Sequence, residues 1–251
     1  IKTIANVSHD YNEPWIQWYS IFTGLNHKQH KVFSLGESVK YSHDQIWEKL
    51  EQKNLKIASI GSMNAVNRLK SSENIFLPDP WTNTQPQASK YDKIFYLLLK
   101  KIILDRNKGI KYYIKILLFL IISLKYVPLK DYLEYVSIIK LAMSKNWSRV
   151  FILDYLLTQF YLSKIVRNNF NFTTLFLNGL AHNQHHNLRF LRNKNKKDNI
   201  IYQTYKFYDL IIGKILKGIK NQNIQIFFAS GLSQKIVSDD IYYYSLNNKF
   251  I

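Results

Sequence analysis

The feature that most constrains the fold of this chain is an apolar run that leads directly into a group of histidines. The run, Phe172 to Leu180, has the length and composition of a buried strand. It is followed by three of the chain's seven histidines, His182, His185 and His186. The pattern predicts a buried strand that stops at a histidine-rich turn or at the start of a helix.

The spacing of these side chains suits a metal site if the segment is helical. Asn178, His182 and His186 then share one face of the helix, with His185 beside them. Imidazoles grouped in this way bind zinc or another divalent metal such as manganese. The alternative is a polar surface turn that happens to be rich in histidine, because the carboxylate that normally completes such a site is missing nearby.

A helix followed by a short strand predicts the class of the fold. The helix is expected over Ser42–Asn54, where Ser42 and Gln45 form a capping box. The strand Leu55–Ile60 follows and ends at Gly61. A helix that leads into a strand is the unit of an α/β fold with a parallel sheet.

A second step of the same kind follows the histidines, with a helix over Ile200–Ile219 and a strand over Ile224–Ala229. The predicted fold class is therefore α/β, with a mostly parallel sheet flanked by helices. Ligands of such sheets bind at the carboxyl ends of the strands. Three strand ends of this kind are expected, at Gly61–Asn64, Asn178–His186 and Ser230–Gln234.

The N-terminal part of the chain holds three further predicted segments. Ile1–Val7 is a short strand or the end of one, and Ile16–Leu25 is a helix that stops near Gly24. Ile75–Trp81 is predicted to be a rigid loop, because it contains two prolines. The first residues show no signal peptide.

Residues 90–166 differ from the rest because they are apolar, studded with lysine and poor in Gly and Pro. They predict three or four helices with breaks near Asn107–Gly109, Pro128 and Asn146. They therefore form a segment distinct from the residues on either side.

The most apolar part of this segment is Ile116–Leu124, which is too short to span a bilayer. It is predicted to be a buried core helix. The alternative is a helix that lies in the membrane interface, with its flanking lysines extended toward the headgroups. These lysines are Lys111, Lys115 and Lys125.

Composition limits the classes of protein that the chain can belong to. A length of 251 residues with 47% hydrophobic residues fits one large domain or a domain with a sizeable insert. The absence of cysteine excludes disulfides, thiolate catalysis and Cys-type zinc sites.

The net charge of +18 fits an anionic small molecule, an anionic polymer or an anionic membrane as partner. It also fits the codon usage of an AT-rich genome, since Lys, Asn, Ile and Tyr are all abundant. The lysines form no sustained block, and the chain carries no motif specific for nucleic acid.

Three stretches, in this order, resemble the alkaline phosphatase superfamily in its phosphodiesterase and sulfatase-like branch. Ser20–Leu25 followed by His30 is similar to the family's T-G-x-x-P-x-x-H-G segment. Gln45–Leu50 leading into Lys56–Gly61 resembles its T-I-W-x-x-L helix and G-Y-x-x-A-x-x-G strand. Asn178–His182 has the spacing of its D-x-x-x-H metal motif.

The resemblance implies both a fold and a chemistry. It covers residues 4–80 and 172–234 and implies a mixed, mostly parallel sheet between helices. Residues 90–166 would then be a helical insert or cap in an α/β core formed by residues 1–89 and 167–251. It also implies two divalent metals, usually zinc, that activate a Thr or Ser nucleophile and bind a phosphoryl group.

Several residues of the family pattern are replaced. The nucleophile position falls at about Pro14, and Ser8 is the nearest hydroxyl. Asn178 stands in place of the motif aspartate, and Ser230–Leu232 lacks two further metal ligands. His182 is therefore the only usual ligand position that is clearly kept.

A single rebuilt metal site would draw on His185 and His186, together with Asp10 or Asp79. The resemblance implies that His30 supports the fold and takes no part in the chemistry. Asp79, which lies between two prolines, is predicted to be a rigid turn or cap residue.

Three functions remain as hypotheses. The first is a diverged hydrolase or transferase of phosphate or sulfate esters. The second is a non-catalytic relative that binds such esters. The third is a basic binding or membrane-surface protein in which the helices of residues 90–166 carry the function.

Overall fold

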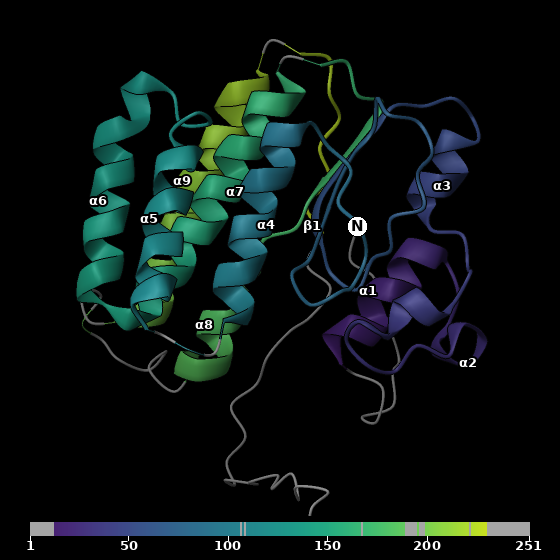
Figure 1. Ribbon diagram of the computed structural model, residues 1–251, viewed down its shortest axis with the longest axis horizontal. Helices are drawn as coiled ribbons and strands as arrows, with labels where there is room; N and C mark the ends of the chain where they lie inside the picture. Colours follow the sequence, from purple (N-terminus) through teal and green to yellow (C-terminus); the bar gives the residue numbers. More distant parts are fainter. Residues whose placement is uncertain are drawn as a thin grey trace, which may run out of the picture.

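The computed structural model describes residues 13–105, 107, 109–166, 168–188, 195, 199–220 and 222–229. In this part of the chain, helices surround a small parallel sheet (Figure 1), so the predicted α/β class is confirmed. An arrangement specific to alkaline phosphatases stays a prediction. The elements, in chain order, are α1 (Pro14–Thr23), α2 (His27–His30), η2 (Glu37–Lys40), α3 (Ile46–Glu51), β1 (Ile57–Ser62), β2 (Ile75–Pro78), α4 (Lys90–Leu104), α5 (Ile110–Ser123), η3 (Leu129–Asp131), α6 (Tyr132–Ser144), η4 (Asn146–Ser148), α7 (Arg149–Ile165), β3 (Phe172–Leu175), α8 (Gly179–Asn187) and α9 (Ile200–Ile219).

The described strands form one sheet in the order β2–β1–β3, and both pairs are parallel. In the central strand, Ala58 lies opposite Ile75 of β2 and Thr173 of β3. Most of β1 is buried, as is typical of a strand inside a parallel sheet. The strand predicted over Leu55–Ile60 is confirmed, although it begins and ends two residues later.

Each face of the sheet has its own hydrophobic core. Neighbouring positions of a strand point to opposite faces, so Ile57 and Ile60 enter different clusters. Ile57 packs with Trp47 of α3 and Phe22 of α1. Ile60 packs with side chains of the helices on the other face. Figure 1 shows these layers, with α1 to α3 on one side of β1 and α4 to α7 and α9 on the other.

α1 has the start and end signals that the sequence predicted. Pro14 lies in the first turn, where its missing N–H is not needed. Gly24 ends the helix with a left-handed φ of 72°, and its N–H donates to the Ser20 carbonyl. The helix predicted over Ile16–Leu25 is therefore confirmed, with a start two residues earlier.

The capping box of α3 lies three residues later than predicted. Gln45, and not Ser42, is the N-cap, and the Glu48 carboxylate accepts from the Gln45 N–H. The buried Gln45 side chain also donates to the Val66 carbonyl at 2.9 Å and accepts from the Val66 N–H at 3.0 Å. These bonds to a distant loop fix the start of the helix at Ile46.

β2 contradicts the prediction of a rigid loop over Ile75–Trp81. Its residues pair with β1, and its proline falls at the end of the strand. On the other edge of β2, Phe76 exchanges two backbone hydrogen bonds with Gln87, at 2.7 and 2.8 Å. The prolines end this strand, but they do not prevent it.

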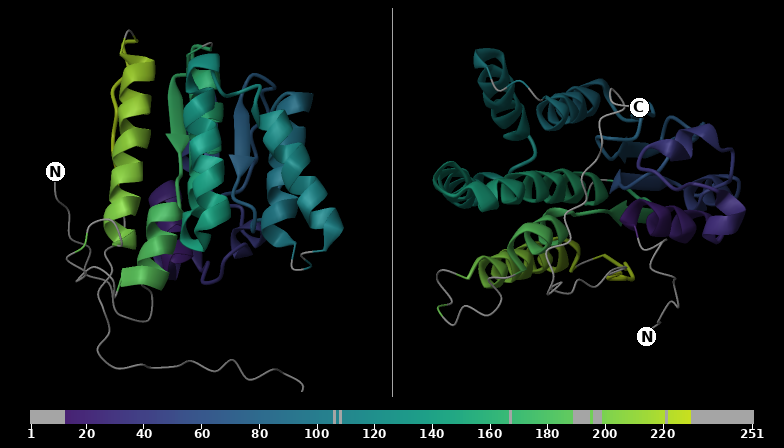
Figure 2. Two further views of the ribbon diagram at one scale, coloured as in Figure 1. Left: turned by 90° about the vertical axis from the view of Figure 1, so that its left-hand side faces the viewer. Right: turned by 90° about the horizontal axis from the view of Figure 1, so that it is seen from below.

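β3 is shorter and less buried than the predicted strand Phe172–Leu180. It ends at Leu175, and all of its residues are half-buried. The chain then enters α8, so the expectation that the strand leads to a histidine-rich helix start is confirmed. Figure 2 shows α8 at the end of the sheet toward which the strands point.

The strand predicted over Ile224–Ala229 does not form. α9 has the predicted bounds, but these six residues, which come shortly after it, have no regular structure. Phe227 and Phe228 are largely exposed. Apolar residues alone do not make a strand unless its backbone finds a partner. The strand predicted over Ile1–Val7 lies outside the described residues.

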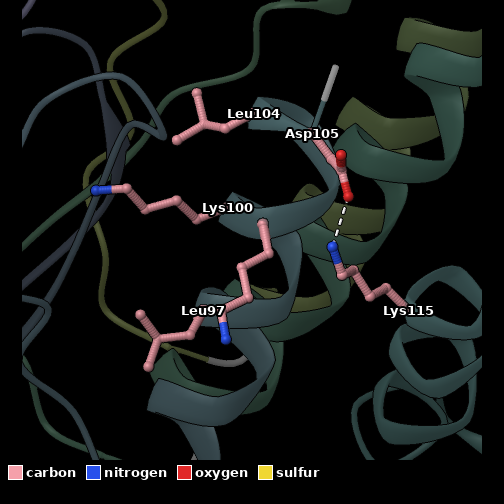
Figure 3. Close-up of a pocket in the computed structure, with 6 residues that line it drawn as sticks. Leu97, Lys100, Leu104, Asp105 and Lys115 are labelled. Atoms are coloured by element: carbon pink, nitrogen blue, oxygen red, sulfur yellow. Dashed lines mark hydrogen bonds and ion pairs between the residues drawn. The ribbon is translucent and has the colours of Figure 1, made fainter. Parts of the chain in front are cut away.

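The prediction of three or four helices in residues 90–166 is confirmed by α4, α5, α6 and α7, whose interruptions lie close to the predicted breaks. The helix around Ile116–Leu124 is not a buried core helix, however. In α5 only Phe119 and Ser123 are buried. An open groove beside α4 is lined by residues of α4, by Asp105 at its end and by Lys115 of α5 (Figure 3). Among the described residues, no helix is long and apolar enough to cross a membrane. The division of the chain into domains stays a prediction.

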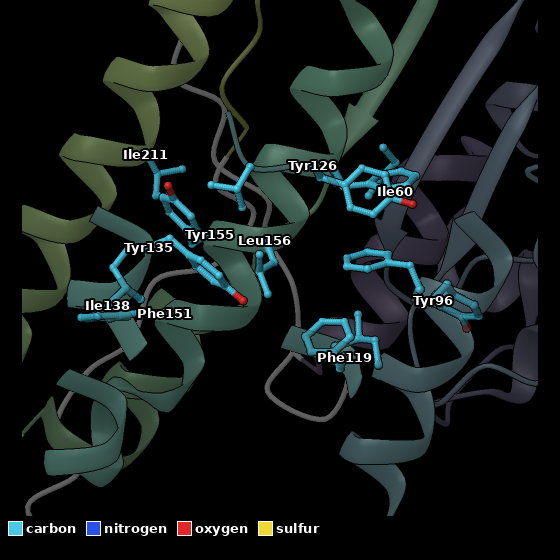
Figure 4. Close-up of a cluster of buried hydrophobic side chains, with 14 of the residues drawn as sticks. Ile60, Tyr96, Phe119, Tyr126, Tyr135, Ile138, Phe151, Tyr155, Leu156 and Ile211 are labelled. Carbon is cyan, nitrogen blue, oxygen red and sulfur yellow. The ribbon is translucent and has the colours of Figure 1, made fainter. Parts of the chain in front are cut away.

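α7 is the centre of the larger core. Phe160 of α7 is fully buried, and its ring stacks on Phe95 of α4 with centroids 5.4 Å apart. At the other end of the helix, Phe151 stacks on Phe207 of α9 at 4.0 Å. Figure 4 shows further side chains of this core, among them Tyr155 and Leu156 of α7, Phe119 of α5 and Ile211 of α9.

Candidate functional site

α8 presents its histidines at the carboxyl end of the sheet. Asn178 is the N-cap of the helix, and its carbonyl accepts from the His182 N–H at 3.0 Å. The rings of His182 and His186 lie on the same face, with centroids 4.7 Å apart. Both rings and the side chain of His185 are exposed. The helix therefore offers a pair of accessible imidazoles, as their spacing predicted.

Partial desolvation and the neighbouring His186 lower the pKa of His182. His185 adds a weaker repulsion of the same sign. A lowered pKa keeps the His182 imidazole neutral at pH 7, which is the form that binds a metal ion.

The pair does not extend into a larger metal site. Within the described residues, no three His, Cys, Asp or Glu side chains lie close enough to hold a metal ion together. His185 therefore does not complete a three-ligand site with the pair, and neither does Asp79. The two-metal centre implied by the resemblance does not fit these residues, and no reaction step is assigned to it.

A buried carboxylate of α7 caps the N-terminus of α8 through hydrogen bonds. Asp154 accepts from the Gly179 N–H at 2.9 Å and from the Tyr208 hydroxyl, whose oxygen accepts from the Leu180 N–H at 2.8 Å. Burial raises the pKa of Asp154 to about 6. These bonds use the first N–H groups of α8, to which an anion would otherwise bind. No local pattern in the sequence indicates this contact, and its only signal is an acidic residue in an apolar helix.

Hydrogen bonds of Asn64 and Asp79 connect the loops that follow β1 and β2. Asp79 accepts from the N–H groups of Asn64 and Trp81, both at 2.8 Å, and from the Thr82 N–H at 3.0 Å. Asn64, at a left-handed φ of 54°, accepts in turn from the Gly36 N–H at 2.9 Å. Burial raises the pKa of Asp79. Asp79 is thus the turn residue that its position between prolines predicted.

Ser20 and His30 form a pair that resembles an activated nucleophile but has the wrong proton arrangement. The Ser20 Oγ lies 2.8 Å from His30 Nε2, while the Val32 N–H donates to His30 Nδ1 at 3.0 Å. Nδ1 is therefore unprotonated, and the neutral ring carries its proton on Nε2, which donates a hydrogen bond to the Ser20 oxygen. Burial lowers the pKa of His30 to about 4, which keeps the ring neutral. The pair supports the fold, as expected for His30.

The nucleophile position implied by the resemblance contains no hydroxyl. Pro14 occupies it as the first residue of α1. The alternative candidate Ser8 lies outside the described residues, as do Asp10 and Ser230–Leu232. A catalytic hydroxyl is therefore not assigned.

Comparisons with protein-family models, curated proteins and solved structures gave no match for this chain. The resemblance to the alkaline phosphatase superfamily therefore rests on the sequence motifs alone.

Proposed function

We propose that this chain is a diverged relative of the alkaline phosphatase superfamily that binds phosphate or sulfate esters at the carboxyl end of its sheet. In this proposal the protein does not use the family's two-metal hydrolysis. The proposal is supported by the order of the motifs, which correspond to α1 and α2, to α3 and β1, and to the link from β3 to α8. The net charge of +18 favours an anionic ligand.

The observation that carries the proposal is the contact between His182 and His186 on the helix that follows β3. Two imidazoles one turn apart on an exposed face fit a single divalent ion, and nitrogen ligands favour zinc over manganese. A metal ion bound there supplies a positive charge for the oxygens of a phosphate or sulfate group.

The other polar groups at this end of the sheet support binding without hydrolysis. Asp79 and Asp154 are buried and accept hydrogen bonds from inside the protein, so they are not free to act as bases on a ligand. The Ser20 hydroxyl accepts a hydrogen bond from His30 Nε2–H and is therefore not activated by this imidazole.

Zinc binding tests the site directly. Titration calorimetry with zinc chloride should show binding to the wild-type chain, and His182→Ala and His186→Ala should each weaken it at least about tenfold, because each removes one of two ligands. His185→Ala is the matched control, since it removes an exposed histidine from the same helix. Equal affinity in all four proteins, or no zinc binding at all, would contradict the site.

Ester binding requires a separate measurement. We expect phenyl phosphate or phenyl sulfate to shift the NMR signals of α8 in the presence of zinc, and His182→Ala to abolish these shifts. Zinc binding without any ester binding would contradict the proposed ligand. Zinc-dependent turnover of a chromogenic phosphate or sulfate ester would contradict the absence of hydrolysis.

A further inference from the structure

The outer side of α5 carries an apolar stripe that the fold does not use. Ile110, Ile114, Leu117 and Ile121 follow each other at helical spacing, and each is at least half exposed, with 75% exposure at Ile110. The inner side of the same helix already contributes Phe119 to the core. α5 is therefore apolar on two sides, and only one of them is needed for folding.

The neighbouring helix extends this apolar area. Ile94, Leu97 and Leu104 of α4 are also exposed, and α4 packs against α5. We call these three residues, together with the four of the α5 stripe, the α4–α5 surface. An open groove at α4 is lined by two of these residues, Leu97 and Leu104, together with Lys100, Lys101, Asp105 and Lys115. Figure 3 shows Leu97, Lys100 and Leu104 extending from one side of α4, and Asp105 paired with Lys115 of α5 on the other.

The charges around the α4–α5 surface are positive. The carboxylates of residues 90–125 are both paired, Asp92 with Lys164 at 2.7 Å and Asp105 with Lys115. Exposed lysines remain on both helices and on the turn after α5, and these are Lys90, Lys93, Lys101, Lys111 and Lys125. Lysine side chains are long enough to keep their ammonium groups in a polar layer while the apolar stripe of α5 enters an apolar phase beneath it.

We propose that the α4–α5 surface docks on an anionic lipid bilayer. Apolar side chains surrounded by lysines match the acyl boundary and the headgroups of such a bilayer. A second copy of the chain is a poor occupant, because it would bring the same lysines and a net charge of +18 against them. With 14 residues, α5 is too short to span a bilayer but long enough to lie along its interface. The proposal does not depend on ester binding, which uses α8.

Vesicle sedimentation of the full chain tests the proposal. With vesicles of phosphatidylcholine and phosphatidylserine at a ratio of about 7:3 the protein should pellet, with pure phosphatidylcholine it should stay largely in the supernatant, and salt should release it. Ile121→Asn should lower the partition coefficient about fivefold, since an exposed apolar contact with the bilayer is lost. Ile21→Asn is the matched control, because both isoleucines are 54% exposed and α1 lies across the sheet.

The double variant Ile114→Asn/Ile121→Asn should abolish pelleting while its circular dichroism and melting temperature stay those of the wild type, because both positions are exposed. Three vesicle results would overturn the proposal: equal loss of binding in Ile21→Asn, equal binding to neutral and anionic vesicles, or no binding to either. A dimer detected by analytical ultracentrifugation and broken by the double variant would assign the surface to a second copy and would also overturn it.

Discussion

α5 and α7 lie in the same apolar segment, yet α7 is largely buried and α5 is half exposed. α7 even contains buried polar side chains, Asp154, Thr158 and Gln159, each of which is hydrogen-bonded inside the protein. The outer stripe of α5 is apolar and faces outward. Apolar composition therefore does not decide burial here. α7 is buried because it packs against the sheet and against α6, α8 and α9, whereas α5 packs mainly against α4 and leaves its outer side uncovered.

The largest expected difference between the two helices is in core packing. Phe160→Ala in α7 should lower the free energy of unfolding by about 3–5 kcal/mol, because it leaves a cavity among stacked rings. Leu117→Ala in α5 should change it by less than about 0.5 kcal/mol, because Leu117 is 59% exposed. Urea unfolding curves measure both values. A loss of several kcal/mol in Leu117→Ala would mean that α5 is packed more tightly than its exposure indicates.

A second difference concerns the pH dependence of stability, which α7 influences and the outer stripe of α5 does not. Burial raises the pKa of Asp154 from 3.8 to about 6. The folded protein therefore binds this proton more tightly than the unfolded chain, so the contribution of Asp154 is fully present below about pH 4 and is lost as the pH rises through 6. At 1.36 kcal/mol per pKa unit, the loss is about 3 kcal/mol.

Asp154→Asn isolates this contribution. The amide can still accept from Gly179 and Tyr208 but does not titrate. The unfolding free energy of the wild type minus that of the variant should fall by about 2–3 kcal/mol between pH 4 and pH 7. Glu48, whose pKa burial raises to about 7, is present in both proteins and cancels in the difference. A difference that stays constant with pH would show that Asp154 does not titrate in this range.

Local signals were enough to predict some elements of the fold. α1 was predicted from Gly24 and α9 from its helical pattern. Two short apolar segments show where local signals stop. Ile75–Pro78 forms a strand despite its proline, and residues 224–229 do not, because the first lies beside β1 and the second has no paired neighbour among the described residues. Pairing partners are set by the whole chain.

The candidate site was predictable to a similar extent. Spacing placed His182 and His186 on one face, because helical geometry is local. The contact of Asp154 with Tyr208 joins residues 54 positions apart, so no local pattern contains it. The proton arrangement of His30 depends on one backbone N–H, that of Val32, which only the folded structure positions.

The smallest expected effect concerns the inner side of α5, where Ser123 joins the helix to α6. The Ser123 Oγ donates to the Leu120 carbonyl at 2.7 Å and lies 2.9 Å from the Tyr135 hydroxyl. Ser123→Ala should lower the unfolding free energy by about 1 kcal/mol, the net value of a buried hydrogen bond, because Tyr135 keeps its own bond to Leu120.

Ser144→Ala in α6 is the control for this variant, since Ser144 makes the same kind of bond to the Leu141 carbonyl at 2.9 Å but is exposed, and its loss should be close to zero. Ser123→Ala should also leave vesicle binding unchanged, because the outer stripe of α5 is intact. A variant that lost both stability and vesicle binding would show that the two sides of α5 are not independent. α5 would then differ from α7 only in how much of it is buried, and not in having a side that folding does not need.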